Sequence, residues 1–150
     1  MEHKPRVDLQ AVADLSPVES RAPMSREERL AQWVEALERE PKRILRPLHG
    51  IEFRKPDERR AIRADNSPLT VAYEDPVLRS EGLGSDQLGD AIDFFQLSDH
   101  EAHTAFCSCH LGSSFEARLA ATRVKALIKR SARPYHGSVW GRIVSALFAR

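Results

Sequence analysis

Three histidines and both cysteines of the chain lie within residues 100–110. Imidazole nitrogens and thiolate sulfurs are the usual protein ligands of zinc, and four of them fill a tetrahedral site. On a helix, at about 100° per residue, four of these side chains share one stripe: His100, His103, Cys107 and His110. The pattern therefore raises the hypothesis of a zinc or iron site in a metal- or redox-responsive protein. A straight helix cannot enclose a metal ion, so a second segment, such as that of His49 or His136, would have to complete the site.

The spacing of these residues departs from known metal motifs. A zincin carries H-E-x-x-H and a covalent haem site carries C-x-x-C-H, and the chain is one residue short of each. We therefore favour a histidine-rich polar helix face that holds no cofactor. The same helical phase places Cys109 in the core and Cys107 beside imidazoles on the polar face. Because protonated neighbours lower the pKa of a thiol, we expect Cys107 to be the more reactive cysteine.

Along most of the chain, apolar residues recur at the intervals typical of an amphipathic helix. Three Ser-x-x-Glu capping boxes mark helix starts, since each pair can satisfy free backbone donors at the first turn. These pairs are Ser25 with Glu28, Ser98 with Glu101, and Ser113 with Glu116. They predict one helix that Pro41 ends, a second from 99 to about 110, and a third that runs to about residue 129.

The middle of the chain is more interrupted. We predict a helix over 57–64 after Pro56, a helix over 86–95, and a short extended piece at 51–53. Residues 69–73 fit either a strand or a helix. Together these segments predict a mostly α fold, a small bundle of five to six helices with room for a short two-stranded patch. The predicted core residues are Leu30, Trp33, Leu37, Ile92, Phe95, Phe106, Cys109, Val124 and Leu127.

Prolines and glycines divide the chain into three parts. We predict a flexible N-terminal arm over 1–24, a helical domain over 25–131, and a hinge with an amphipathic helix over 132–150. A basic amphipathic helix can dock in a partner's groove, lie on an anionic membrane or pack on its own core. We favour a protein partner, bound through Trp140, Ile143, Val144, Leu147 and Phe148 together with Lys125, Lys129, Arg130 and Arg133.

The composition is that of a globular protein. With 41% hydrophobic and 30% charged residues among 150, collagen-like and wholly disordered chains are excluded. The net charge of +1 identifies no partner. Carboxylate pairs and glycine-rich segments match no catalytic or phosphate-binding motif, so we expect a small cytoplasmic, non-catalytic interaction or regulatory protein. A second alternative is a helix-turn-helix DNA-binding regulator, with Arg118, Lys125 and Lys129 on the second helix after Gly112.

Overall fold

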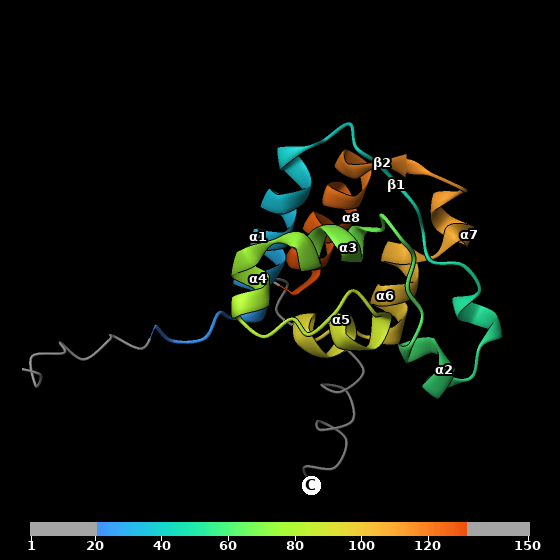
Figure 1. Cartoon of the computed structure of the whole chain (residues 1–150), viewed down its shortest axis with the longest axis horizontal. Helices are drawn as coiled ribbons and strands as arrows, with labels where there is room; N and C mark the ends of the chain where they lie inside the picture. Colours follow the sequence, from blue (N-terminus) through green and yellow to red (C-terminus); the bar gives the residue numbers. More distant parts are fainter. Residues whose placement is uncertain (1–20, 132–150) are drawn as a thin grey trace, which may run out of the picture.

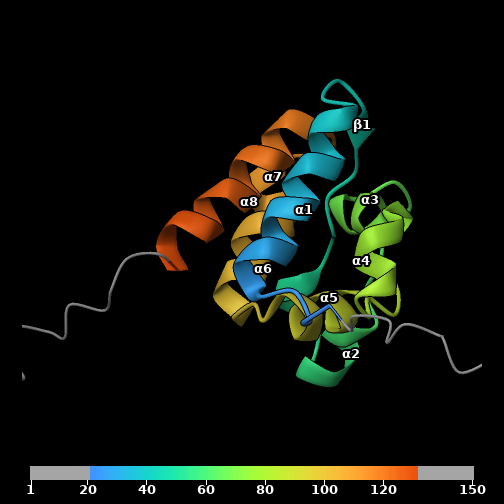
Figure 2. The ribbon, with the colours of Figure 1, turned by 90° about the vertical axis from the view of Figure 1, so that its left-hand side faces the viewer.

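A computed structural model describes residues 21–131 of the chain. Its longest two helices, α1 (Arg26–Arg39) and α8 (Ala117–Ser131), pack side by side (Figures 1 and 2). The predicted capping box at the start of α1 is formed, because the Ser25 side chain accepts from the Glu28 N–H and the Glu28 side chain accepts from the Ser25 N–H. The apolar residues of α1 face α8 and the rest of the core.

The segment after α1 contains β1 (Ile44–Leu45), the 3₁₀ turn η2 (Ile51–Phe53) and α2 (Pro56–Arg60). The extended piece expected at 51–53 is therefore wrong. Helix α2 ends four residues earlier than expected, because the chain turns so that the Ile62 carbonyl accepts the Leu88 N–H at 2.9 Å. This bond ties the end of α2 to the start of α5 (Leu88–Phe95).

Prolines begin the two helices that cover the other side of α1 (Figure 2). Helix α3 (Pro68–Glu74) resolves the ambiguity of residues 69–73, since Ser67 caps it and Pro68 occupies the first turn. Helix α4 (Pro76–Ser80) follows at once, and the buried Asp75 carboxylate accepts from the Val77 and Leu78 N–H groups. The residue types at these helix starts thus supply the caps locally.

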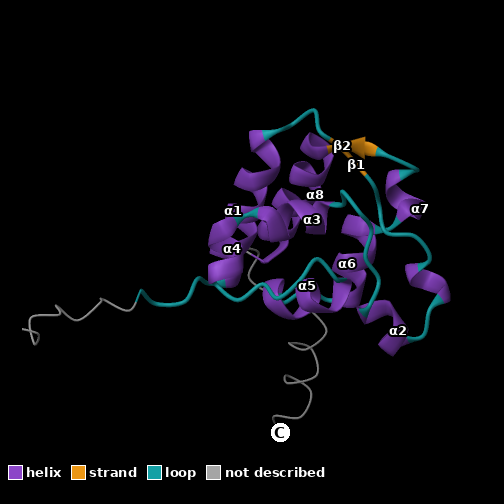
Figure 3. Ribbon diagram, viewed as in Figure 1, coloured by secondary structure: helices purple, strands orange, loops and turns teal. Residues whose placement is uncertain are grey.

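The last third of the fold contains α6 (Asp99–Phe106), α7 (Ser108–Leu111), β2 (Phe115–Glu116) and α8. Strands β1 and β2 pair antiparallel, with Ile44 opposite Glu116 and Leu45 opposite Phe115 (Figure 3). The capping box predicted at Ser113 is wrong, because Glu116 belongs to this patch. Backbone carbonyls of residues 41 and 43 accept the first N–H groups of α8 instead.

The mostly α fold and the two-stranded patch are confirmed. Residues 21–131 contain eight α-helices rather than five to six, because three of them have only four or five residues each. Seven of the nine predicted core residues are buried: Leu30, Trp33, Leu37, Phe95, Phe106, Val124 and Leu127. Ile92 is partly buried against this core, whereas Cys109 is exposed.

Aromatic rings join three helices at the centre of the fold. The Trp33 ring of α1 stacks on Phe95 of α5, with 4.5 Å between ring centroids, and lies 5.4 Å from the ring of Phe106 in α6. The indole Nε1–H donates to the Pro68 carbonyl at 3.0 Å. The contact with Trp33 therefore fixes the position of Phe106, the last residue of α6, which directly precedes Cys107.

Two predictions concern residues that the structure does not describe. The flexible arm lies in 1–20 apart from its last few residues, and the hinge and amphipathic helix lie in 132–150. Met24, at the end of the expected arm, is buried, and its N–H donates to a Glu81 carboxylate oxygen at 2.9 Å. Among the helices of residues 21–131, none is long and apolar enough to cross a membrane.

Candidate metal centre

The histidine- and cysteine-rich stretch is two helices rather than one. Cys107 has an extended backbone and separates α6 from α7. Its segment pairs with residue 48: the Leu48 N–H donates to the Phe106 carbonyl at 2.8 Å, and the Ser108 N–H donates to the Leu48 carbonyl at 3.0 Å. These long-range bonds replace helical bonds at this point, so the helix predicted over 99–110 stops and restarts.

The break reverses the predicted roles of the two cysteines. Cys107 is fully buried and Cys109 is exposed. The prediction that Cys109 lies in the core and Cys107 on the polar face is therefore wrong. The helical phase used for it is lost at Cys107, where an extended residue turns the following side chains to a new direction.

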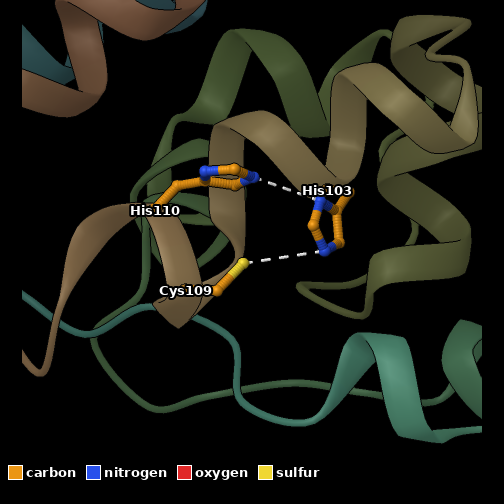
Figure 4. Close-up of side chains that lie close together, drawn as sticks. All are labelled: His103, Cys109 and His110. Carbon is orange, nitrogen blue, oxygen red and sulfur yellow. Dashed lines mark hydrogen bonds between the residues drawn. The ribbon is translucent and has the colours of Figure 1, made fainter.

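Three potential ligands converge at the junction of α6 and α7. Figure 4 shows His103, Cys109 and His110 pointing toward one another. Cys109 Sγ lies 3.7 Å from His103 Nε2, and His110 Nε2 lies 3.3 Å from His103 Nδ1. The two imidazole rings meet edge to face, with 5.0 Å between centroids. One ligand atom from each residue falls within 4.8 Å of the others, as a shared metal ion requires.

A second group, formed by the exposed Glu52, the buried Cys107 and the exposed Cys109, shares Cys109 with the first. Cys109 Sγ lies 2.8 Å from Cys107 Sγ, and the Cys107 thiol donates to Glu52 Oε2 at 3.3 Å. Glu52, Cys107 and Cys109 also bring potential ligand atoms within 4.8 Å of one another. A chain of polar contacts therefore runs from the half-buried imidazole of His103 through both thiols to the exposed Glu52 carboxylate.

The surroundings of Cys107 and Glu52 shift the pKa values of both side chains. Burial, and then the contacts with Cys109 and Glu52, raise the pKa of the Cys107 thiol to about 12. The pKa of Glu52 lies below its ordinary value because its own backbone N–H and the Cys107 thiol donate to the carboxylate, with His103 and Arg59 adding positive charge nearby. Without a metal ion, Cys107 is thus a neutral thiol that donates to an ionised carboxylate.

Two of the four proposed ligands, His103 and His110, meet in the observed cluster, and the other two do not. His100 lies outside both groups of ligands and lines a pocket of about 420 Å³, which it shares with His103 and Glu52. His49 is exposed and outside both groups of ligands in residues 21–131, and His136 lies outside the described residues. Cys109 replaces Cys107 as the sulfur ligand beside the histidines. Sequence reasoning missed Glu52, for which no spacing signal exists, because it reaches the site from a different segment.

The basic residues predicted to meet a partner lie partly within the described structure. Lys125 forms an ion pair with Glu38 of α1, and Arg118 forms one with Glu116. Lys129 and Arg130 are exposed at the end of α8. The short turn expected between the two helices of a helix-turn-helix is replaced by α7 and β2. The residues predicted to dock a partner at 133–148 lie outside the described ranges.

Comparisons of the chain with protein-family models, with curated proteins and with solved structures give no match.

Proposed function

We propose that this is a small zinc-binding regulatory protein that holds the ion with His103, Cys109 and His110. The observation that carries the proposal is that one ligand atom from each of these three side chains lies within 4.8 Å of the other two. With bonds of about 2.0–2.1 Å to nitrogen and about 2.3 Å to sulfur, neighbouring ligands of tetrahedral zinc lie about 3.3 Å apart for two nitrogens and about 3.6 Å for nitrogen and sulfur. The observed contacts of 3.7 Å to Cys109 and 3.3 Å to His110 are made by the two different nitrogens of His103, Nε2 and Nδ1, and only one of these can bind the ion. Zinc binding would therefore draw the third ligand in from its present separation of up to 4.8 Å.

The donor set favours zinc over harder ions. Two imidazoles and a thiolate suit zinc and other borderline or soft metals, whereas calcium and magnesium take oxygen ligands. Three protein ligands leave one tetrahedral position, which either a water molecule or Cys107 can fill. Coordination by Cys107 would require the metal to displace the proton that its raised pKa otherwise retains.

A regulatory role follows from where the ligands lie in the fold. His103 belongs to α6, whereas Cys109 and His110 belong to the four-residue helix α7. A bound ion would tie α7 to α6 and so restrain the connection that leads through β2 to α8. Metal binding then stabilises the folded state by mass action, by about 2.7 kcal/mol at a free concentration one hundred times Kd. We further propose that α8 and the residues after it dock a protein partner, with Lys129 and Arg130 contributing charge.

The test is metal binding by tag-free full-length protein and its variants. We expect one Zn²⁺ per chain by elemental analysis after dialysis, and a tetrahedral Co²⁺ spectrum with a sulfur-to-cobalt charge-transfer band. The intensity of that band distinguishes one thiolate ligand from two. H103A, C109S and H110A should each weaken zinc binding at least 100-fold in a competition titration, because each removes one of three ligands.

His100→Ala is the matched control, since His100 is an exposed histidine of the same helix that lines the pocket. We expect this variant to bind zinc as the wild type does. Absence of stoichiometric zinc, or equal weakening by His100→Ala and His110→Ala, would contradict the proposal. Circular dichroism of each variant checks that the helical fold is retained.

A further inference from the structure

The two sulfur atoms of the site lie closer together than the roughly 3.8 Å that would separate two sulfur ligands of one tetrahedral zinc ion. Cys107 Sγ and Cys109 Sγ lie 2.8 Å apart, although one thiol is buried and the other is exposed. A disulfide bond joins sulfurs at about 2.05 Å, so bridging needs an approach of about 0.8 Å. We propose that Cys107 and Cys109 are a redox-active dithiol, which hydroperoxides oxidise to a disulfide within one chain. The proposal goes beyond zinc binding and does not depend on it.

Exposure assigns a different role to each cysteine. Cys109 is on the surface, where a small peroxide can reach its sulfur, whereas Cys107 is fully buried. Cys109 is therefore the residue that reacts with the oxidant, and Cys107 is the resolving cysteine. An accessible thiol next to a second thiol is the usual arrangement in redox-sensing proteins.

The reaction has two steps. In the first, the Cys109 thiolate attacks one oxygen of the hydroperoxide. The S–O bond forms as the O–O bond breaks, and the leaving oxygen takes a proton to become an alcohol, or water when the oxidant is hydrogen peroxide. In the second, the Cys107 thiol gives its proton to the Glu52 carboxylate as Cys107 Sγ attacks Cys109 Sγ. The S–S bond forms as the S–O bond breaks, and the hydroxide that leaves takes up that proton as water. Two thiols are oxidised to one disulfide and one hydroperoxide is reduced.

The hydrogen bonds of Cys107 orient it for the second step. Its S–H donates to Glu52 Oε2, while the Cys109 thiol donates to the Cys107 sulfur. The Cys107 lone pairs therefore face Cys109. Glu52 contacts Cys107 and not the oxidant, so its part is to orient Cys107 and to accept its proton.

The disulfide should be reversible rather than structural. It would close a ring over one intervening residue, Ser108, and bonds that depart from relaxed disulfide geometry are more easily reduced. Oxidation would also remove the Cys109 thiolate from the zinc site. This consequence, unlike the dithiol itself, rests on the proposed zinc function.

The experiment treats reduced, chelator-washed full-length protein with hydrogen peroxide and follows it by intact mass, peptide mapping and non-reducing electrophoresis. We expect a mass loss of two hydrogen atoms, a peptide with residues 107 and 109 linked, no covalent dimer, and full recovery of both thiols with dithiothreitol. Sulfinic acid at Cys109 as the main wild-type product, or a disulfide between two chains, would overturn the proposal.

Two variants separate the roles of the cysteines. Cys107→Ser should halt at a Cys109 sulfenic acid that dimedone traps, and Cys109→Ser should leave Cys107 unmodified over the time in which the wild type reacts fully. Rapid oxidation of Cys107 in Cys109→Ser would contradict the assignment. The mass measurement on the wild-type protein tests the proposal by itself if a variant fails to fold.

A parallel arm with zinc keeps the two proposals distinguishable. Bound zinc should slow disulfide formation at least tenfold, because it occupies Cys109. If the disulfide forms but zinc neither binds nor protects, the zinc function alone is refuted. If zinc binds but Cys109 proceeds to sulfinic acid in the zinc-free protein, the dithiol alone is refuted.

Discussion

Alkylation of Cys107 in the native protein should be about a thousand times slower than in the unfolded chain. The perturbation is a thiol reagent such as iodoacetamide, which reacts with the thiolate. Folding raises the pKa of Cys107 from 9.0 to about 12, and each pKa unit changes the thiolate fraction about tenfold at a pH below both values. The three-unit difference therefore lowers the reactive fraction about 1,000-fold, before burial limits access of the reagent.

The assay uses the wild-type protein, because Cys109 itself contributes to the raised pKa of Cys107. Timed quenching in buffer and in denaturant at pH 8, followed by tandem mass spectrometry, locates the label on Cys107 or on Cys109. Cys107→Ser supplies the control, because the exposed Cys109 should react in buffer at a rate close to that in denaturant. A native rate for Cys107 within tenfold of its denatured rate would refute the reasoning. That result would mean that the side chain is neither buried nor held as a neutral thiol.

The same shift predicts how stability depends on pH. The folded state keeps the Cys107 proton up to about pH 12, whereas the unfolded chain releases it near 9. The neutral thiol's contribution to stability is therefore complete below pH 9 and is lost as pH rises from 9 toward 12. The difference in unfolding free energy between the wild type and Cys107→Ala, measured with chelator, should shrink over that range. A constant difference would contradict the shift.

Three substitutions test how the helices of the fold are packed and capped, each by chemical denaturation. Trp33→Phe should cost about 1–3 kcal/mol, because it leaves the Pro68 carbonyl without its indole donor; a loss below 0.5 kcal/mol would show that this bond contributes little. Gly89→Ala should cost about 1–3 kcal/mol, since its Cβ would lie 2.8 Å from Cβ of Arg60 and push α2 away from α5. Asp75→Ala should cost about 2–3 kcal/mol, because the start of α4 loses its buried cap, whereas Asp75→Asn, which keeps one oxygen acceptor, should cost less.

Local signals account for the helices that were predicted well. The boxes at Ser25 and Ser98 need only side chains three residues apart, and both are formed. The box at Ser113 has the same sequence pattern, but carbonyls of residues 41 and 43 accept the first N–H groups of α8. A cap from a distant segment leaves no trace in the local sequence.

The amino-acid sequence by itself determined that the fold is mostly helical, where most helices begin, and that metal-ligating side chains are concentrated within 100–110. The tertiary structure decided which of those side chains meet. Pairing of Leu48 with the segment around Cys107 interrupts the helix, buries one thiol, exposes the other and places Glu52 beside the buried one. A prediction from helical periodicity assumes that the helix continues unbroken from one residue to the next. It fails at Cys107 because this residue is extended and its segment is stabilised by hydrogen bonds to a segment almost sixty residues away.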